Sequence, residues 1–178
     1  MAAQPVLRTV TDTPDDEPPA AAVDHTFALQ VASRAGGRQM LRCFACGTCT
    51  AGCPVAEIDE RYNPRRIIRM VLMGFKDEVL RSEFIWLCAG CYTCQERCPQ
   101  GVRVAEVMRT LRNLAVEEGI VHPAFKAQAE LIRGMGRIYE IEDFDNKKRV
   151  RAGLPELRKT LEDIKTLFER QKLNERLG

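Results

Sequence analysis

The sequence predicts an all-α fold, and three observations carry that prediction. Apolar residues recur at helical spacing in several segments, and no segment shows the apolar–polar alternation of a half-buried strand. Asn63-Pro64 supplies an N-cap followed by a proline at the first helical position, and His122-Pro123 opens another helix. Hydrophobic residues make up 45% of the chain but aromatic residues only 6%, which suits a compact helical protein.

The first expected helices precede and follow the first group of cysteines. A short helix over residues 27–35 is ended by Gly36 and Gly37. The helix that begins at Pro64 ends near Gly74. Its apolar face consists of Ile67, Ile68, Val71 and Leu72.

A short helix over residues 76–81 follows, and Ser82 is expected to cap the turn that leads to the second group of cysteines. The next amphipathic helix ends near Gly119 and is followed by a helix over residues 123–133. The apolar face of the amphipathic helix consists of Val104, Val107, Met108, Leu111 and Leu114.

Residues 155–177 predict one long polar helix with a narrow apolar stripe. The stripe is too short for a coiled coil, so packing on the chain's own core and docking on a partner both stay open. Its residues are Leu157, Leu161, Ile164, Phe168, Leu173 and Leu177.

The eight cysteines fall in two runs of identical spacing, and none lies outside them. Each run reads C-x2-C-x2-C-x3-C-P, the ligand pattern of proteins with two iron–sulfur clusters. Each cysteine has a counterpart 45 positions later, as do Thr48 and Pro54, so one loop is used twice. The runs are Cys43, Cys46, Cys49 and Cys53, then Cys88, Cys91, Cys94 and Cys98.

The spacing predicts two [4Fe–4S] clusters with exchanged fourth ligands. Three cysteines at spacing three lie on one side of a wrapped loop, and the fourth leaves toward the other cluster. The glycines at positions 47, 52 and 90 let the backbone approach the clusters, and the prolines at 54 and 99 help to end each loop. The expected ligands are Cys43, Cys46, Cys49 and Cys98 for the first cluster, and Cys88, Cys91, Cys94 and Cys53 for the second.

Other uses of these cysteines explain the pattern less well. A zinc site needs four ligands, so the additional cysteines of each run would be idle. A disulfide framework is typical of small secreted domains, whereas this chain has 178 residues and no signal-peptide pattern at its N-terminus. Structural cysteines scattered through a core would not repeat in register.

Charge and hydropathy exclude several classes of protein. The formal net charge of +2 falls to about −2 once two clusters of about −2 each are counted, and no nucleic-acid-binding motif is present. The longest stretch without a charge, residues 43–56, is shorter than the roughly 18 apolar residues of a membrane span. We therefore expect a protein that neither binds nucleic acid nor inserts directly into a membrane. Oxygen-sensitive clusters and the absence of a targeting pattern point to the cytoplasm.

The chain contains no recognisable substrate site. It has no dinucleotide fingerprint, P-loop, catalytic triad or HExxH motif. Trp86 and Tyr92 flank the second run and are expected to shield sulfur from water. His122 is expected to be structural. With every cysteine assigned to a cluster, the sequence favours a relay that carries electrons between other subunits.

The segment 41–102 also resembles a known family. Its stretches NPRRIIRMVLMGFKDEV and IWLCAGCYTCQERCPQGV are similar to the C-type subunit of heterodisulfide reductase, and the resemblance covers about residues 25–155. A weaker similarity is to the C-terminal half of the iron–sulfur subunits of succinate dehydrogenase and fumarate reductase. The long helical linker between the runs, residues 54–87, fits the same α-helical ferredoxin type, because small ferredoxins with this motif have a shorter link and a β-rich fold.

The resemblance implies a function and partners. A flavin-containing A-type subunit would deliver electrons, and an iron–sulfur B-type subunit would reduce the disulfide. This chain would be the non-catalytic relay of that oxidoreductase complex. The alternative is a related bacterial complex with quinone, a sulfur carrier or an aromatic acyl-CoA as electron acceptor. A third hypothesis is that the clusters only stabilise the fold and transfer no electrons.

The sequence also suggests a division of the chain into three parts. Residues 1–24 are proline-rich and acidic and are expected to be a disordered arm. Residues 25–140 form the two-cluster α-helical ferredoxin domain. Residues 141–178 form a linker and a C-terminal helix for subunit docking.

Overall fold

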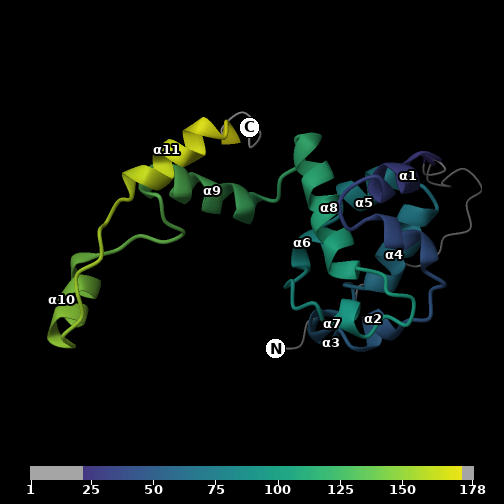
Figure 1. Ribbon diagram of the computed structural model, residues 1–178, viewed down its shortest axis with the longest axis horizontal. Coiled ribbons are helices and arrows are strands. Elements are labelled where there is room, and N and C mark those ends of the chain that lie inside the picture. Colours follow the sequence, from purple (N-terminus) through teal and green to yellow (C-terminus); the bar gives the residue numbers. More distant parts are fainter. Residues whose placement is uncertain (1–21, 174–178) are drawn as a thin grey trace, which may run out of the picture.

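The computed structural model describes residues 22–173, and every regular element within them is helical (Figure 1). The all-α prediction is therefore confirmed, while nearly all of the expected acidic arm lies outside the described residues. The elements are α1 Phe27–Ala32, η1 Arg38–Arg42, α2 Thr48–Ala51, α3 Pro54–Ile58, α4 Pro64–Leu72, α5 Lys76–Leu80, α6 Phe84–Leu87, α7 Thr93–Glu96, α8 Val104–Glu117, α9 Pro123–Met135, α10 Asp143–Arg151 and α11 Glu162–Arg170.

The start of α4 shows how a local signal also joins two elements. The Asn63 side chain accepts a hydrogen bond from the Arg66 N–H at 2.9 Å, as its N-cap position predicts. The same side-chain oxygen accepts a bond from the Thr50 hydroxyl at 2.9 Å, and that hydroxyl accepts one from the Arg65 N–H at 3.1 Å. The cap therefore ties α4 to α2, which carries part of the first cysteine run.

One hydrophobic core supports both cysteine runs. Helices α1, α4, α5 and α8 pack around it, and α2, α3 and α7 lie together at one end of the body (Figure 1). Fully burying a valine, leucine, isoleucine, phenylalanine or methionine side chain contributes about 1.5–3 kcal/mol to folding. The largest of its residues are Phe27, Met40, Tyr62, Ile68, Leu80, Ile85, Met108 and Leu111.

The C-terminal arm, residues 123–173, extends away from this body (Figure 1). Helices α9 and α11 pack against each other, and Phe168 is only 6% exposed between them. Gly136 ends α9 with φ of +71°, and a Cβ there would lie 2.5 Å from the Leu161 carbonyl oxygen. Glycine is therefore required both for the backbone conformation and for the close return of the chain.

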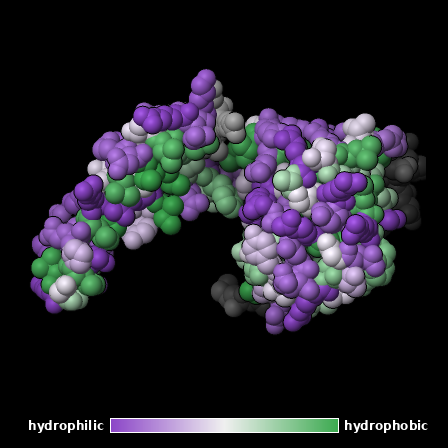
Figure 2. Space-filling model, viewed as in Figure 1, coloured by the Kyte–Doolittle hydropathy of each residue, from purple (hydrophilic) through white to green (hydrophobic). Residues whose placement is uncertain are grey.

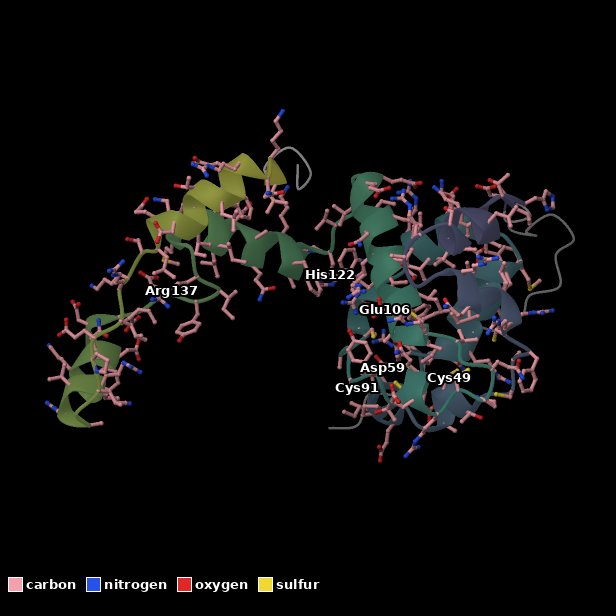
Figure 3. The ribbon with its side chains drawn as sticks, viewed as in Figure 1. Cys49, Asp59, Cys91, Glu106, His122 and Arg137 are labelled. Carbon is pink, nitrogen blue, oxygen red and sulfur yellow. The ribbon has the colours of Figure 1, made fainter. Side chains whose placement is uncertain are left out.

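An aromatic contact joins the arm to the body. The Trp86 ring lies 5.1 Å from the Phe125 ring and 6.2 Å from the His122 ring, centroid to centroid. His122 also caps α9, since its Nδ1 accepts a hydrogen bond from the Ala124 N–H at 3.2 Å. The structural role expected for His122 is confirmed, and Figure 3 shows this residue at the junction.

The prediction of one helix over residues 155–177 is wrong for its first part and for residues 171–172, where the chain turns after α11 ends at Arg170. Helix α11 begins only at Glu162, because earlier backbone groups bond elsewhere. The Asn146 side chain holds both the N–H and the carbonyl of Leu157, and the Leu161 N–H donates to the Met135 carbonyl. The stripe residue Leu177 lies outside the described residues.

The cap expected at Ser82 is also wrong. Its hydroxyl donates backward to the Val79 carbonyl at 2.7 Å, so it closes α5 and does not begin α6. Hydroxyl groups bond equally well to a carbonyl behind them or to an N–H ahead of them, and tertiary context selects between the two.

Apolar residues are unevenly distributed on the surface. Figure 2 shows them gathered along the arm, where Ile138, Tyr139 and Phe144 are each more than half exposed. Across residues 22–173, no helix combines the length and the apolar character that crossing a membrane requires.

Candidate metal centre

The two cysteine loops share one backbone conformation. Ala45 and Gly90 occupy equivalent positions and have φ of 61° and 64°, while Gly47 and Tyr92, also equivalent, have φ of 89° and 64°. Each loop thus has two left-handed residues, one of them not glycine, a conformation that costs about 1–2 kcal/mol per such residue. The sequence repeat is therefore a structural repeat.

Four cysteines line the first hollow, and they come from both runs. It encloses about 370 Å³ of empty space, part of it open to solvent. Its remaining wall is mostly apolar, with Phe44, Ile68 and Val104 among its residues, and Arg65 is its one charged side chain. The four cysteines are Cys43, Cys46, Cys49 and Cys98.

The second hollow has the same donor set and nearly the same size, about 310 Å³ of empty space. Tyr62 and Tyr92 contribute to its wall together with Val55 and Ala105, and no charged side chain does. Helices α2 and α7, which carry Cys49 and Cys94, contact each other. The four cysteines of this hollow are Cys53, Cys88, Cys91 and Cys94.

The cysteines differ in how readily they ionise. Cys46 and Cys91 are exposed, and hydrogen bonds from Thr48 and Thr93 lower the pKa of each thiol. Burial raises the pKa of Cys49, and burial together with neighbouring thiols raises the pKa of Cys94 to about 11. Since a metal binds the thiolate, a bound cation must supply the free energy that deprotonates the buried members.

Two further donors point at sulfur. The Val102 N–H donates to Cys98 Sγ at 3.3 Å. Tyr62 is only 2% exposed and hydrogen-bonds to Cys88; burial, then this bond, raises the pKa of its hydroxyl far above the ordinary value. The hydroxyl therefore stays protonated and remains a donor to sulfur. No sequence signal marks Tyr62, since nothing in its spacing relates it to the cysteines.

Arg112 fixes the second loop to α8. Its Nε donates to the Ile85 carbonyl at 2.7 Å, and its Nη2 donates to the Cys88 carbonyl at 2.6 Å. The guanidinium also lies 5.9 Å from the centre of the Phe125 ring, so it touches the arm as well. In the sequence Arg112 is simply one polar position on an amphipathic helix, and no signal there indicates this function.

The expectations for the residues beside the cysteines are met unevenly. Tyr92 lines the second hollow, as its shielding role requires, but Trp86 packs on His122 and Phe125 and lines neither hollow. Gly52 does not adopt a left-handed conformation; a Cβ there would lie 2.6 Å from Arg97 Nη1. Its small size admits a neighbouring guanidinium.

The chemistry of both hollows fits an iron–sulfur cluster. Each offers four thiols, apolar walls and a hydrogen-bond donor to sulfur, which are the features that bind such clusters and adjust their potentials. None of the eight cysteines, all of which are described, is in a disulfide. Among residues 22–173, no three or more His, Cys, Asp or Glu side chains gather closely enough to hold one metal ion. Figure 3 shows Cys49 and Cys91 on the two neighbouring loops.

Comparison with known proteins agrees with this chemistry. The 4Fe-4S dicluster domain family matches residues 39–102. The chain is 36% identical to the C-type subunit of the H(2):CoB-CoM heterodisulfide,ferredoxin reductase of Methanothermobacter thermautotrophicus, over 88% of this chain and 84% of the relative. The chain belongs to the family of C-type subunits of heterodisulfide reductase.

Other members of this family show similar identity. The C-type subunit of the ferredoxin:CoB-CoM heterodisulfide reductase of Methanosarcina mazei is 36% identical over 80% of this chain and 91% of its own. The iron–sulfur C-type subunit of the CoB--CoM heterodisulfide reductase of Methanopyrus kandleri is 34% identical over 76% and 74%. As a member of this family, the chain is an iron–sulfur, electron-transport component of an oxidoreductase, and the family name implies a complex of several subunits.

Proposed function

We propose that this chain relays electrons through two [4Fe–4S] clusters between other subunits of a heterodisulfide-reductase-type complex. The observation that carries the proposal is the pair of similar hollows, each lined by four cysteines and built on two contacting loops. A cluster bound in each would accept and release one electron at a time. Two such sites on contacting loops suit a relay, because electron transfer slows steeply with distance.

In the proposed ligand sets, the fourth cysteine of each run binds the cluster that the first three cysteines of the other run hold. Cys98 would complete the site of Cys43, Cys46 and Cys49, and Cys53 would complete that of the second run. The composition of the two hollows supports this assignment. The apolar walls would limit water around the sulfurs, and the donors from Val102 and Tyr62 would stabilise negative charge on them.

The proposed direction of transfer is from a flavin-containing A-type subunit to a disulfide-reducing B-type subunit. This chain would hold no substrate itself. We further propose that residues 141–178 help to anchor one partner, which the exposed Phe144, Val150 and Leu167 support. A complex with quinone, a sulfur carrier or an aromatic acyl-CoA as acceptor would use the same relay, but the names of the relatives favour a heterodisulfide.

Rapid-mixing experiments test the relay. The reconstituted full-length chain is reduced with dithionite and mixed separately with the A-type subunit, the B-type subunit and a heterodisulfide, while the visible absorbance of the clusters is followed. We expect fast oxidation by the B-type subunit, fast reduction of the oxidised chain by the reduced A-type subunit and no reaction with the heterodisulfide alone. If the clusters exchange electrons with neither subunit, the relay function is refuted and the clusters only stabilise the fold.

A further inference from the structure

The segments that build the two hollows differ in charge. Residues 35–56, 62–76 and 97–105 supply all of the first hollow and contain no aspartate or glutamate. By contrast, residues 82–96, which supply most of the second hollow, contain no lysine or arginine but include Glu83 and Glu96. The first hollow therefore has one basic side chain in its wall, whereas the second has no charged side chain in its wall.

Three arginines at the first hollow are exposed and have no acidic partner. Arg42 precedes the ligand Cys43, Arg65 lines the hollow, and Arg69 lies one helical turn beyond Arg65, about 6 Å along α4. None of the three makes an ion pair or a side-chain hydrogen bond in the described part of the chain. We call these residues the basic rim.

Some other cations of the body have acidic partners, although the exposed Arg38, Arg66, Arg81 and Arg97 likewise form no ion pair within residues 22–173. Arg34 pairs with Glu117 at 2.7 Å, and Lys76 pairs with Glu118 at 2.6 Å. Three neighbouring unpaired arginines repel one another and do not stabilise the fold. Arg65 faces the site of a negatively charged cluster, which explains its position, but Arg42 and Arg69 do not line the hollow.

Two large exposed apolar side chains flank Arg42 and Cys43 in the sequence. Phe44 is 60% exposed and lines the first hollow, and Leu41 is 49% exposed three residues before it. An apolar centre with a charged rim is the usual anatomy of a protein–protein interface, and phenylalanine and arginine are enriched in such surfaces. Cys46, one of the proposed ligands, is itself exposed at this hollow.

We infer that this face, with Leu41 and Phe44 at its centre and the basic rim around them, docks a partner protein whose own redox centre lies within an acidic surface. The inference rests on the proposed relay function. It means that this partner exchanges electrons with the cluster proposed for the first hollow. The rim would steer the two proteins together, while the apolar centre would bring the proposed first cluster close to the partner's centre.

Removal of the outer rim charges tests this assignment. The double variant Arg42→Gln/Arg69→Gln spares Arg65, which lines the hollow. A matched control, Arg34→Gln/Lys76→Gln, makes the same change in net charge where both cations pair with the C-terminal end of α8. Such exposed ion pairs contribute little to stability, so both variants should fold and hold their clusters.

The readout is the association rate constant with the purified A-type and B-type subunits, measured at about 0.02 M and about 0.3 M salt. With one of the two subunits, we expect the rim variant to associate about tenfold more slowly at low salt, with a smaller difference at high salt. Dissociation and both cluster potentials should change little, and the control should behave as the wild type. These results would support the assignment.

Two outcomes would overturn it. One is a rim variant that associates with both subunits at the wild-type rate at low salt. The other is a rim variant that loses binding to phosphatidylserine vesicles or duplex DNA but keeps wild-type association with both subunits, since the rim would then serve a membrane or a nucleic acid. Failure of the wild-type chain to exchange electrons with either subunit would instead refute the proposed relay function.

Discussion

Replacing Tyr62 by phenylalanine removes one buried hydroxyl that hydrogen-bonds to Cys88. The ring is only 2% exposed and lies in the core, so phenylalanine keeps the packing and loses only the oxygen. The sulfur of Cys88 then has one donor fewer. Because a donor stabilises negative charge on sulfur, its loss should disfavour the reduced form of the second cluster.

The size of this effect follows from ordinary hydrogen-bond energies. A hydrogen bond contributes about 1 kcal/mol to stability when both partners are neutral and about 2 kcal/mol when one is charged. The sulfur is negatively charged in both oxidation states, and reduction adds one further negative charge, so we take the hydrogen bond to be stronger in the reduced state by an increment of about 1 kcal/mol. For a one-electron couple, about 59 mV corresponds to about 1.4 kcal/mol, so the potential should fall by about 40 mV. The free energy of unfolding should fall by about 1 kcal/mol as well.

A redox titration followed by EPR measures the two clusters separately. The potential of the second cluster should fall and that of the first should stay constant, because Tyr62 lines only the second hollow. Tyr139→Phe is the matched control, since Tyr139 is 55% exposed on the arm. Unchanged potentials in the Tyr62 variant, or a shift of the first cluster alone, would refute the reasoning.

Three further predictions concern the ligands, the loss of the clusters and the arm. Cys53→Ser should perturb the cluster of the second run and Cys98→Ser that of the first, as seen by EPR; the opposite selectivity would contradict the exchange of ligands. Removal of both clusters by a chelator should lower the helicity measured by circular dichroism, because metal–thiolate bonds organise loops that hold few large apolar residues; unchanged helicity and melting would argue against this. Phe168→Ala should destabilise the packing of α11 on α9 by about 3–5 kcal/mol while both clusters remain, which hydrogen exchange of the arm can measure. Equal protection of α11 in the variant and the wild type would show that this packing does not hold the arm.

Much of the fold could be predicted because its signals are local. The caps at Asn63 and His122 and the glycines at 74 and 119, both left-handed, fix helix ends through residues a few positions apart. The apolar periodicity of residues 104–114 likewise identifies the buried face of α8. Such signals depend on backbone geometry within one or two turns, so no tertiary information is needed.

The predictions that are wrong have a common cause. At residues 155–161 the backbone bonds to Asn146 and Met135, which are distant in the sequence, and helix propensity is overridden there. Trp86 lies two residues before Cys88, and this position predicts that its ring lies beside sulfur. In the structure the ring packs against Phe125 and His122 instead, because the start of the arm lies next to it. Neither contact leaves a periodic or motif signal.

The sequence by itself determined that this is an all-helical iron–sulfur protein with two cysteine loops of one design, because ligand chemistry restricts which residues occur at which spacing. Only the tertiary structure decided what surrounds those loops. The hydroxyl of Tyr62 bonds to Cys88 Sγ, Arg112 bonds to the Cys88 carbonyl, and the arginines of the basic rim lie near the first hollow. Apart from Arg42, which directly precedes Cys43, nothing in the spacing of these residues relates them to the cysteines, and packing brings them to the cysteine loops. Charge and hydrogen bonding act through space, so their partners are known only once the chain has folded.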